Sequence, residues 1–287
     1  MFLVFAVKLA GIRFLVHLFV FHTERGETSI MTTAIFSTLN RKELTYLETN
    51  FRYSNQHSAE MISAVKLLDE ELLLSNLNSL SAQLSARSLI TAASQFSKHY
   101  AFLLTTVSLY AMTMWNKGMD LSLENILLEF PNSNNKSFPT ININDLKALT
   151  SSECNRQTWR DAVIKHVFFE NLSKVWKSLN AVSKVPMPIL WENTAVYIFW
   201  LYETKMKEEV ADRETRLQIR EDFHYLIKEA SGELFGETEN PLTKFYTKKC
   251  TLSCSEDPVR VRKTCCLYYQ LTDKENRGYC KTCPKQQ

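Results

Sequence analysis

Six of the seven cysteines in this 287-residue chain lie in its last 38 positions, and this concentration constrains the fold more than any other feature. They are Cys250, Cys254, Cys265, Cys266, Cys280 and Cys283. A secreted disulfide scaffold is small and spreads its bridges through the chain, whereas the preceding 249 residues here contain only Cys154. An odd number of cysteines also leaves one thiol unpaired. The distribution therefore predicts a reducing compartment and a local metal site near the C-terminus.

The rest of the chain has the pattern of a helical body. Apolar residues recur every three or four positions in the stretches 61–72, 96–114 and 168–179, as they do on the buried face of a helix. The polar run 132–139 predicts a loop, and the alternation in 140–143 predicts a short strand. We therefore expect a mainly α fold, with a helical body, a small cysteine-rich C-terminal segment and one or two short strands.

Charge divides the chain in the same place as the cysteines. Residues 241–287 contain ten Lys or Arg and four Asp or Glu, a balance of +6, whereas the other 240 residues contain 24 and 27, a balance of −3. We therefore predict a helical body over 31–240 and a separate C-terminal segment over 241–287. Because no obvious linker separates them, we expect the C-terminal segment to pack on the body.

Residues 1–30 need a separate interpretation. The segment is strongly apolar, but Lys8, Arg13 and His17 interrupt it. Each Lys or Arg at the bilayer centre costs roughly 2.5–3.5 kcal/mol, so the segment is a poor membrane-spanning helix. It also has neither the basic start nor the cleavage site of a signal peptide. Two hypotheses remain: an upstream extension that is not native, with the true start near Met31, or a membrane-surface helix.

Several function classes are excluded by composition. Six glycines leave little material for phosphate-binding loops, and neither G-x-G-x-x-G nor G-x-x-x-x-G-K-[ST] occurs. We therefore expect no self-contained nucleotide or flavin enzyme. The six histidines show no ligand spacing with one another. We also expect no nucleic-acid partner, because a cysteine cluster explains the basic residues of the C-terminal segment adequately.

The spacing of four cysteines points to a metal. Cys265-Cys266 is followed by thirteen residues and then by Cys280-Lys281-Thr282-Cys283. Four thiolates complete a tetrahedral zinc site or hold an iron–sulfur cluster. Adjacent side chains diverge, so a vicinal pair is awkward for one ion, whereas a two-iron cluster offers two metal atoms. Spacing alone leaves an iron–sulfur cluster, zinc, disulfides and inert thiols as alternatives.

The residues around these cysteines resemble a known family. Segments 262–271 and 279–283 resemble the C-terminal signature of the FhuF-type ferric siderophore reductases. Segments 189–194 (Ile-Leu-Trp-Glu-Asn-Thr) and 239–242 (Glu-Asn-Pro-Leu) resemble the same family in the same order. The spacer between the two cysteine pairs is shorter in the family than the thirteen residues here. The extra residues fall in the polar run 273–278, which suits a loop insertion.

The resemblance implies a cytoplasmic protein whose segment 241–287 binds a [2Fe–2S] cluster. It implies that the cluster passes one electron to ferric iron in a siderophore, commonly a hydroxamate. With no nucleotide motif in the chain, we expect an external electron donor, such as a ferredoxin or a reduced flavin. Hard oxygen ligands bind Fe(III) far better than Fe(II), so reduction releases the iron. On this interpretation the cluster ligands are Cys265, Cys266, Cys280 and Cys283.

Four residues are weaker candidates for substrate binding. Trp191 and Asn193 either line a pocket or pack the start of a helix and satisfy its backbone groups. Arg262 and Lys263 either contact substrate and tune the cluster or are solvated charges on a strand edge.

The sequence also leaves one function of another class open. The alternative to a reductase is a non-enzymatic helical binding module whose four cysteines hold a structural zinc ion. Peripheral membrane association is compatible with either function. We expect Cys250 and Cys254, spaced C-x₃-C, to be spare thiols rather than replacement ligands or a second site.

Overall fold

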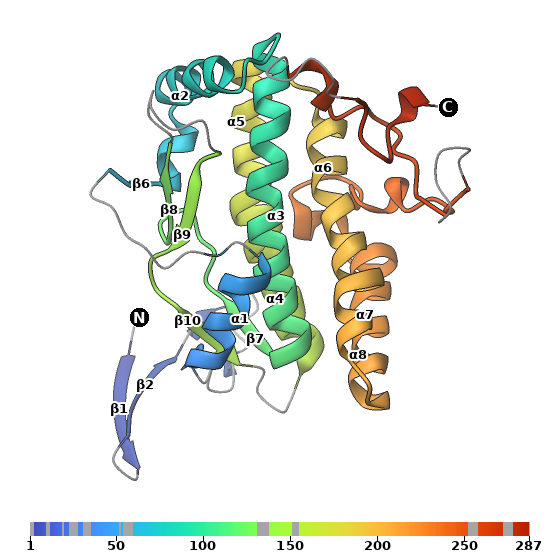
Figure 1. The fold of residues 1–287 in the computed structure, drawn as a ribbon. Helices are drawn as coiled ribbons and strands as arrows, with labels where there is room; N and C mark the ends of the chain where they lie inside the picture. Colours follow the sequence, from blue (N-terminus) through green and yellow to red (C-terminus); the bar gives the residue numbers. More distant parts are fainter. Residues whose placement is uncertain are drawn as a thin grey trace.

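A computed structural model describes residues 3–9, 12–18, 20–22, 28–30, 36–51, 53, 60–130, 138–150, 155–251, 258–271 and 278–286. The structure is mainly helical, which confirms the predicted fold class (Figure 1). The α-helices are α1 (Arg41–Phe51), α2 (Glu70–Gln83), α3 (Leu89–Trp115), α4 (Arg156–Val167), α5 (Ser173–Ser183), α6 (Met187–Trp200), α7 (Met206–Glu209) and α8 (Arg213–His224). The π-helical segments η2 (Phe168–Leu172), η3 (Leu201–Lys205) and η4 (Tyr225–Glu229) continue α4, α6 and α8.

Helix α3 is the centre of the body (Figure 1). The Ser88 side chain caps its first turn by accepting a hydrogen bond from the Thr91 amide at 3.2 Å, and Asn116 ends it in a left-handed conformation. Its side chains are buried or half-buried on every face, with Phe96 and Tyr100 fully buried. A helix of this kind must be surrounded by other elements. Helices α1, α2, α4, α5, α6 and α8 pack against it.

Two small antiparallel sheets complete the body. One has the order β5 (Phe36–Thr38), β10 (Lys147–Thr150), β7 (Lys117–Met119), and the other the order β6 (Ile62–Ser63), β8 (Ile126–Glu129), β9 (Thr140–Ile143). Ile126 pairs with Ile143 and Leu128 with Ile141, and all four are buried, so one face of this sheet joins the core. The strand predicted at 140–143 is confirmed as β9, but the structure has more strands than the one or two expected.

The expected helix over 61–72 is wrong in its first half. Residues 62–63 form β6, residues 64–68 form the 3₁₀ helix η1 (Ala64–Leu68), and α2 begins only at Glu70. Asp69 has an extended backbone, and its side chain accepts a hydrogen bond from the Leu72 amide at 3.0 Å. This is an N-cap, which starts a new helix instead of continuing an old one. Both helices bury residues in the same core, Ala64 and Leu67 from η1 and Leu73 from α2, whereas Val65 and Leu68 of the predicted apolar stretch are exposed.

The described parts of residues 1–30 form strands. β1 (Leu3–Leu9) pairs with β2 (Ile12–Leu18), and β3 (Val20–His22) pairs with β4 (Thr28–Ile30). The described residues therefore do not form the helix considered for this segment. Whether the segment is native, or lies at a membrane surface, stays a prediction. Among the described helices, none combines the length and the apolar character that a membrane span requires.

The C-terminal segment packs on the body, as expected. Its described parts contain the short 3₁₀ helices η6 (Thr243–Phe245), η7 (Tyr268–Gln270) and η8 (Pro284–Gln286), and η5 (Gly232–Phe235) lies just before it. In Figure 1 this segment lies beside α6, near the N-terminal half of α3. The arrangement places the two cysteine pairs of this segment against α3 and α6.

Candidate metal centre

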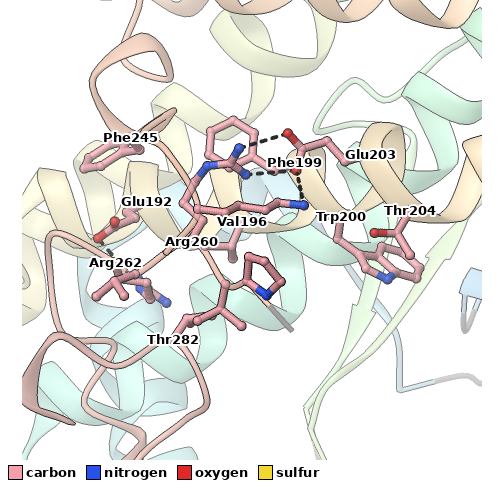
Figure 2. A pocket seen from close by; sticks show the side chains of 14 residues that line it. Glu192, Val196, Phe199, Trp200, Glu203, Thr204, Phe245, Arg260, Arg262 and Thr282 are labelled. Atoms are coloured by element: carbon pink, nitrogen blue, oxygen red, sulfur yellow. Dashed lines mark hydrogen bonds and ion pairs between the residues drawn. The ribbon is translucent and has the colours of Figure 1, made fainter. Parts of the chain in front are cut away.

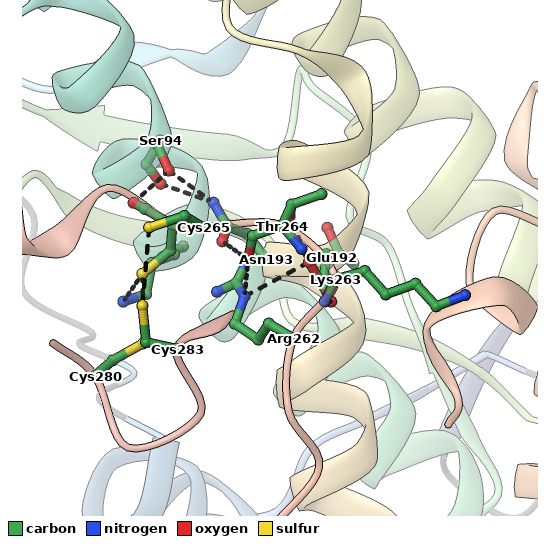
Figure 3. A network of polar contacts seen from close by, with 12 residues as sticks. Ser94, Glu192, Asn193, Arg262, Lys263, Thr264, Cys265, Cys280 and Cys283 are labelled. Carbon is green, nitrogen blue, oxygen red and sulfur yellow. Dashed lines mark hydrogen bonds and ion pairs between the residues drawn. The ribbon is translucent and has the colours of Figure 1, made fainter. Parts of the chain in front are cut away.

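The structure brings the four predicted cysteines together as two pairs (Figure 3). The sulfurs of Cys265 and Cys283 are 4.0 Å apart, and those of Cys266 and Cys280 are 3.9 Å apart. Each pair thus joins one residue of the vicinal motif to one residue of the C-x-x-C motif. Cys266 and Cys283 are buried, and Cys265 and Cys280 are half-buried.

The sulfur separations fit metal ligation. With metal–sulfur bonds of about 2.3 Å, two thiolates on one tetrahedral metal lie about 3.8 Å apart. Both observed pairs are close to that separation. Among the described residues, no three Cys, His, Asp or Glu side chains already gather around one point as the ligands of a single ion do. Two separate sulfur pairs suit a group with two metal atoms, each of which takes two thiolates.

Helix α3 fixes the position of Cys266. The Ser94 hydroxyl and the Gln95 side-chain amide both donate hydrogen bonds to the Cys266 carbonyl, at 2.8 and 2.6 Å. One turn further along, the Lys98 ammonium lies 3.9 Å from the Cys266 sulfur. Ser94 and Gln95 are buried, so these bonds form where water competes little. Cys266 is therefore held through both its backbone and its sulfur.

Helix α6 fixes the residues that precede the vicinal pair. The buried Glu192 carboxylate accepts hydrogen bonds from the Lys263 and Thr264 amides, each at 2.6 Å, and from the Thr264 hydroxyl. The Arg262 guanidinium lies 3.7 Å from the same carboxylate. Asn193, fully buried, accepts from Arg262 at 2.6 Å. These residues form one polar network between α6 and the C-terminal segment (Figure 3).

Asn193 also joins this network to α3. Its side-chain amide donates to the Ser94 carbonyl at 3.0 Å and to the Ser97 hydroxyl at 2.9 Å. Buried polar networks of this kind rigidify a structure when each member has a partner. The network therefore fixes the vicinal cysteines relative to both helices.

Positive charge lies close to the sulfurs. Contact with Cys280 lowers the pKa of Cys266 most, burial opposes that shift, and the charges of Lys98 and Arg262 lower it further. The same contact, together with burial, raises the pKa of Cys280. A metal ion binds thiolates rather than thiols. The cations thus favour the charge state that a metal requires at this position.

Three of the four weaker candidates for substrate binding are buried and hydrogen-bonded to other protein groups, and the side chain of the fourth is exposed. Trp191 is buried and its indole nitrogen donates to Glu237 at 3.1 Å. Asn193 and Arg262 are buried in the polar network, whereas the Lys263 side chain is exposed. Their part in substrate binding stays a prediction.

Sequence reasoning missed several residues that hold the site. Ser94, Gln95, Lys98 and Glu192 were not among its candidates, although Glu192 lies within the family-like segment 189–194. The sequence signal that could have found them is that they are polar residues in otherwise apolar helical stretches. Buried polar side chains need partners, and here the partners lie in the cysteine segment.

Of the remaining cysteines, the structure describes Cys250. Cys250 is exposed, and its backbone pairs with Val259 through two hydrogen bonds of 2.9 Å. Cys154 and Cys254 lie outside the described residues. The expectation that Cys250 and Cys254 are spare thiols stays a prediction.

A comparison with models of known families matches the helical body of the chain. The family model described as ferric iron reductase FhuF-like transporter matches residues 94–252, which is more than half of the chain. The match begins within α3 at Ser94, continues through α8, and ends before the four clustered cysteines. No curated protein matches the chain. The family resemblance predicted from the sequence is confirmed, and the chain belongs to the FhuF-like ferric iron reductase family.

Proposed function

We propose that this protein is a cytoplasmic ferric siderophore reductase with a [2Fe–2S] cluster on Cys265, Cys266, Cys280 and Cys283. The family match supports the reductase role, and the two sulfur pairs support a group with two metal atoms. When bound, such a cluster supplies a carrier for one electron. An external donor, a ferredoxin or a reduced flavin, provides that electron. Fe(III) in a siderophore of the hydroxamate type accepts it and leaves as Fe(II).

The observation that supports this proposal most is the crossed pairing of the sulfurs. A vicinal pair has diverging side chains, and here each member meets a different cysteine of the C-x-x-C motif. The Cys283 amide donates to the Cys280 carbonyl at 2.9 Å, which closes the turn between them. Leu267 has a left-handed backbone, and its amide lies 3.4 Å from the Cys265 sulfur as a donor. The chain's own backbone thus directs the four sulfurs.

The proposal is tested on anaerobically purified protein. We expect about two irons per chain, a reddish-brown colour and, after dithionite reduction, loss of colour with a spin-one-half paramagnetic resonance signal. The reduced protein should then convert ferric hydroxamates to the ferrous state. A colourless protein with one zinc per chain would contradict the proposal and favour the binding module.

Replacing Cys283 with serine is expected to lower the iron content by more than about tenfold. Loss of a residue that only supports a metal ligand already costs about 10- to 100-fold in metal affinity, and Cys283 is itself a proposed ligand. Cys283 is buried and its sulfur faces Cys265, so a hydroxyl there is a poor substitute for a thiolate. Iron analysis and the visible spectrum measure the loss. Cys250→Ser is the matched control, because Cys250 is exposed and should keep the iron. An unchanged spectrum in Cys283→Ser would remove this ligand.

Replacing Lys98 with methionine is expected to lower the reduction potential by about 60 mV, or about 1.4 kcal/mol for one electron. The ammonium lies 3.9 Å from the Cys266 sulfur, and its positive charge favours the more negative reduced state. A spectroelectrochemical titration measures the shift. Lys207→Met removes an exposed charge on α7 and should leave the potential unchanged. Equal potentials in wild type and Lys98→Met would show that this contact does not tune the centre.

A further inference from the structure

The part of the C-terminal segment around the cysteine centre carries cations without acidic side chains. Among its described residues 258–271 and 278–286, five are Lys or Arg and none is Asp or Glu. The five are Arg260, Arg262, Lys263, Lys281 and Lys285. A surface of one charge sign attracts partners of the opposite sign and speeds up their encounter. A cation acts on a partner in this way only where no carboxylate of the protein already neutralises it.

Two of the five cations are neutralised inside the protein. Arg260 donates two hydrogen bonds to Glu203, at 3.0 and 2.9 Å, beside a pocket of about 300 Å³ at the end of α6 (Figure 2). Lys249 lines the same pocket and also contacts Glu203, at 3.0 Å. Arg262 is buried and lies 3.7 Å from the Glu192 carboxylate. The free positive charge of the segment therefore lies away from this pocket.

The other three cations, Lys263, Lys281 and Lys285, are exposed. Within the part of the chain that the structure describes, none of them forms an ion pair with a carboxylate. Lys285 instead donates to the Tyr269 hydroxyl at 2.7 Å, and its ammonium lies 4.5 Å from the centre of the Tyr269 ring. Lys281 lies inside the C-x-x-C motif, directly after Cys280. These lysines thus present unneutralised charge to the solvent.

Two tyrosines accompany the lysines at the edge of the cysteine centre. Tyr279 directly precedes Cys280 and is 43% exposed. Its ring lies 5.2 Å from that of Tyr269, which Lys285 contacts. Cys280 and Cys265 are half-buried, so the centre is least covered at these two cysteines. Tyrosine is enriched at protein–protein interfaces, because its ring is apolar while its hydroxyl tolerates water.

We propose that Tyr269, Tyr279, Lys281 and Lys285 form a docking surface for an acidic electron-carrier protein, an inference that rests on the proposed reductase function. Carboxylates of such a carrier match the unpaired lysines, and its apolar contacts match the tyrosine rings. The carrier is oxidised by one electron, the centre of this protein is reduced by the same electron, and no covalent bond or proton changes place.

The shape of the docking surface favours a protein over a free flavin as the donor. Transient electron-transfer complexes need only a small interface, below about 1,200 Å². A small molecule, in contrast, binds in a concave site that covers most of its surface. The exposed Tyr279 and the exposed lysines form no such enclosure.

The test titrates an oxidised, acidic plant-type ferredoxin into the full-length protein and measures binding by calorimetry, which requires no turnover. The double variant Lys281→Gln/Lys285→Gln is expected to raise the Kd about tenfold, and Tyr279→Ala about threefold. The Kd of the wild type should also rise about tenfold from about 10 to 100 mM salt, as the Debye length falls from about 30 to 10 Å. Arg41→Gln/Lys42→Gln removes two exposed cations on α1 and is the matched control, with a Kd within about twofold of the wild type.

Two results would overturn the docking surface: no binding by the wild type at the lower salt concentration, or equal Kd values for the double lysine variant and its control. Tighter binding of a short DNA duplex, with the same dependence on both lysines, would overturn the protein partner. If substitution inside the C-x-x-C turn lowers the iron content, Lys285→Gln alone decides, with an expected rise in Kd of about threefold. An unchanged Kd in that variant would likewise overturn the surface.

The proposed function is measured separately, from iron content and from reduction of ferric hydroxamates by the dithionite-reduced wild type. A protein that reduces these chelates but binds the ferredoxin equally well without both lysines keeps its function and loses this surface. A protein without iron that still binds the ferredoxin through both lysines loses the function and keeps the surface.

Discussion

Glu192→Ala protein is expected to lose most of its bound iron while it keeps its helical content. Glu192 accepts hydrogen bonds from the amides of Lys263 and Thr264 and from the Thr264 hydroxyl, directly before the vicinal cysteines. Its removal leaves two backbone donors and the buried Arg262 without this carboxylate. Removing one partner of a buried, charged, hydrogen-bonded set costs about 3–5 kcal/mol. We expect the segment around residues 262–266 to detach locally, because the rest of α6 packs through apolar contacts.

The experiment combines iron analysis with hydrogen exchange at the Lys263 and Thr264 amides. Both amides should exchange much faster in Glu192→Ala, while circular dichroism stays close to the wild type. Glu192→Gln keeps an acceptor oxygen and should give an intermediate loss of iron. Glu208→Ala on α7 removes an exposed carboxylate and serves as the control. Full iron occupancy with unchanged amide protection in Glu192→Ala would show that this carboxylate does not hold the site.

Much of the fold was predictable because it depends on local pattern. The stripe 96–114 lies within α3, the helix expected near Trp191 is α6, and 140–143 is β9. The break at Asp69 was not predictable in the same way, because periodicity measures burial and not backbone continuity. The two-residue strand β6 exists only through its pairing with β8, which lies about sixty residues further along the chain.

The candidate site was likewise predictable only in part. The four cysteines could be selected from their spacing and surroundings, because the chemistry of a ligand belongs to its residue type. Their crossed pairing could not, since it depends on how the turn at 280–283 meets the vicinal pair. Nor could Ser94 and Gln95 be selected, because the carbonyl they hold is more than 170 residues away in sequence. Only the tertiary fold brings such partners together.

The other large effect is expected at the opposite end of α3, where Asp222→Ala should lower the free energy of unfolding by about 3–5 kcal/mol. Asp222 of α8 is fully buried and accepts two hydrogen bonds from Arg156, at 2.5 and 2.7 Å, and one from Arg160 at 3.1 Å. Thr113 of α3 donates to it at 3.0 Å. Without the carboxylate, two guanidinium groups lose their buried counter-charge, and the link between α3, α4 and α8 is lost.

Urea denaturation measures this loss, with Asp212→Ala as the control on the same helix. Asp212 only caps α8, by accepting from the Thr215 amide at 2.8 Å, so its loss should cost about 1 kcal/mol. Ser94 and Thr113 are separated by nineteen residues of α3, or about 28 Å. At a temperature where Asp222→Ala is still folded, its iron content should therefore equal that of the wild type. Equal stability of the Asp222→Ala and Asp212→Ala proteins would mean that the buried ion pairs add nothing beyond a cap, whereas loss of iron from folded Asp222→Ala would show that the two ends of α3 are coupled.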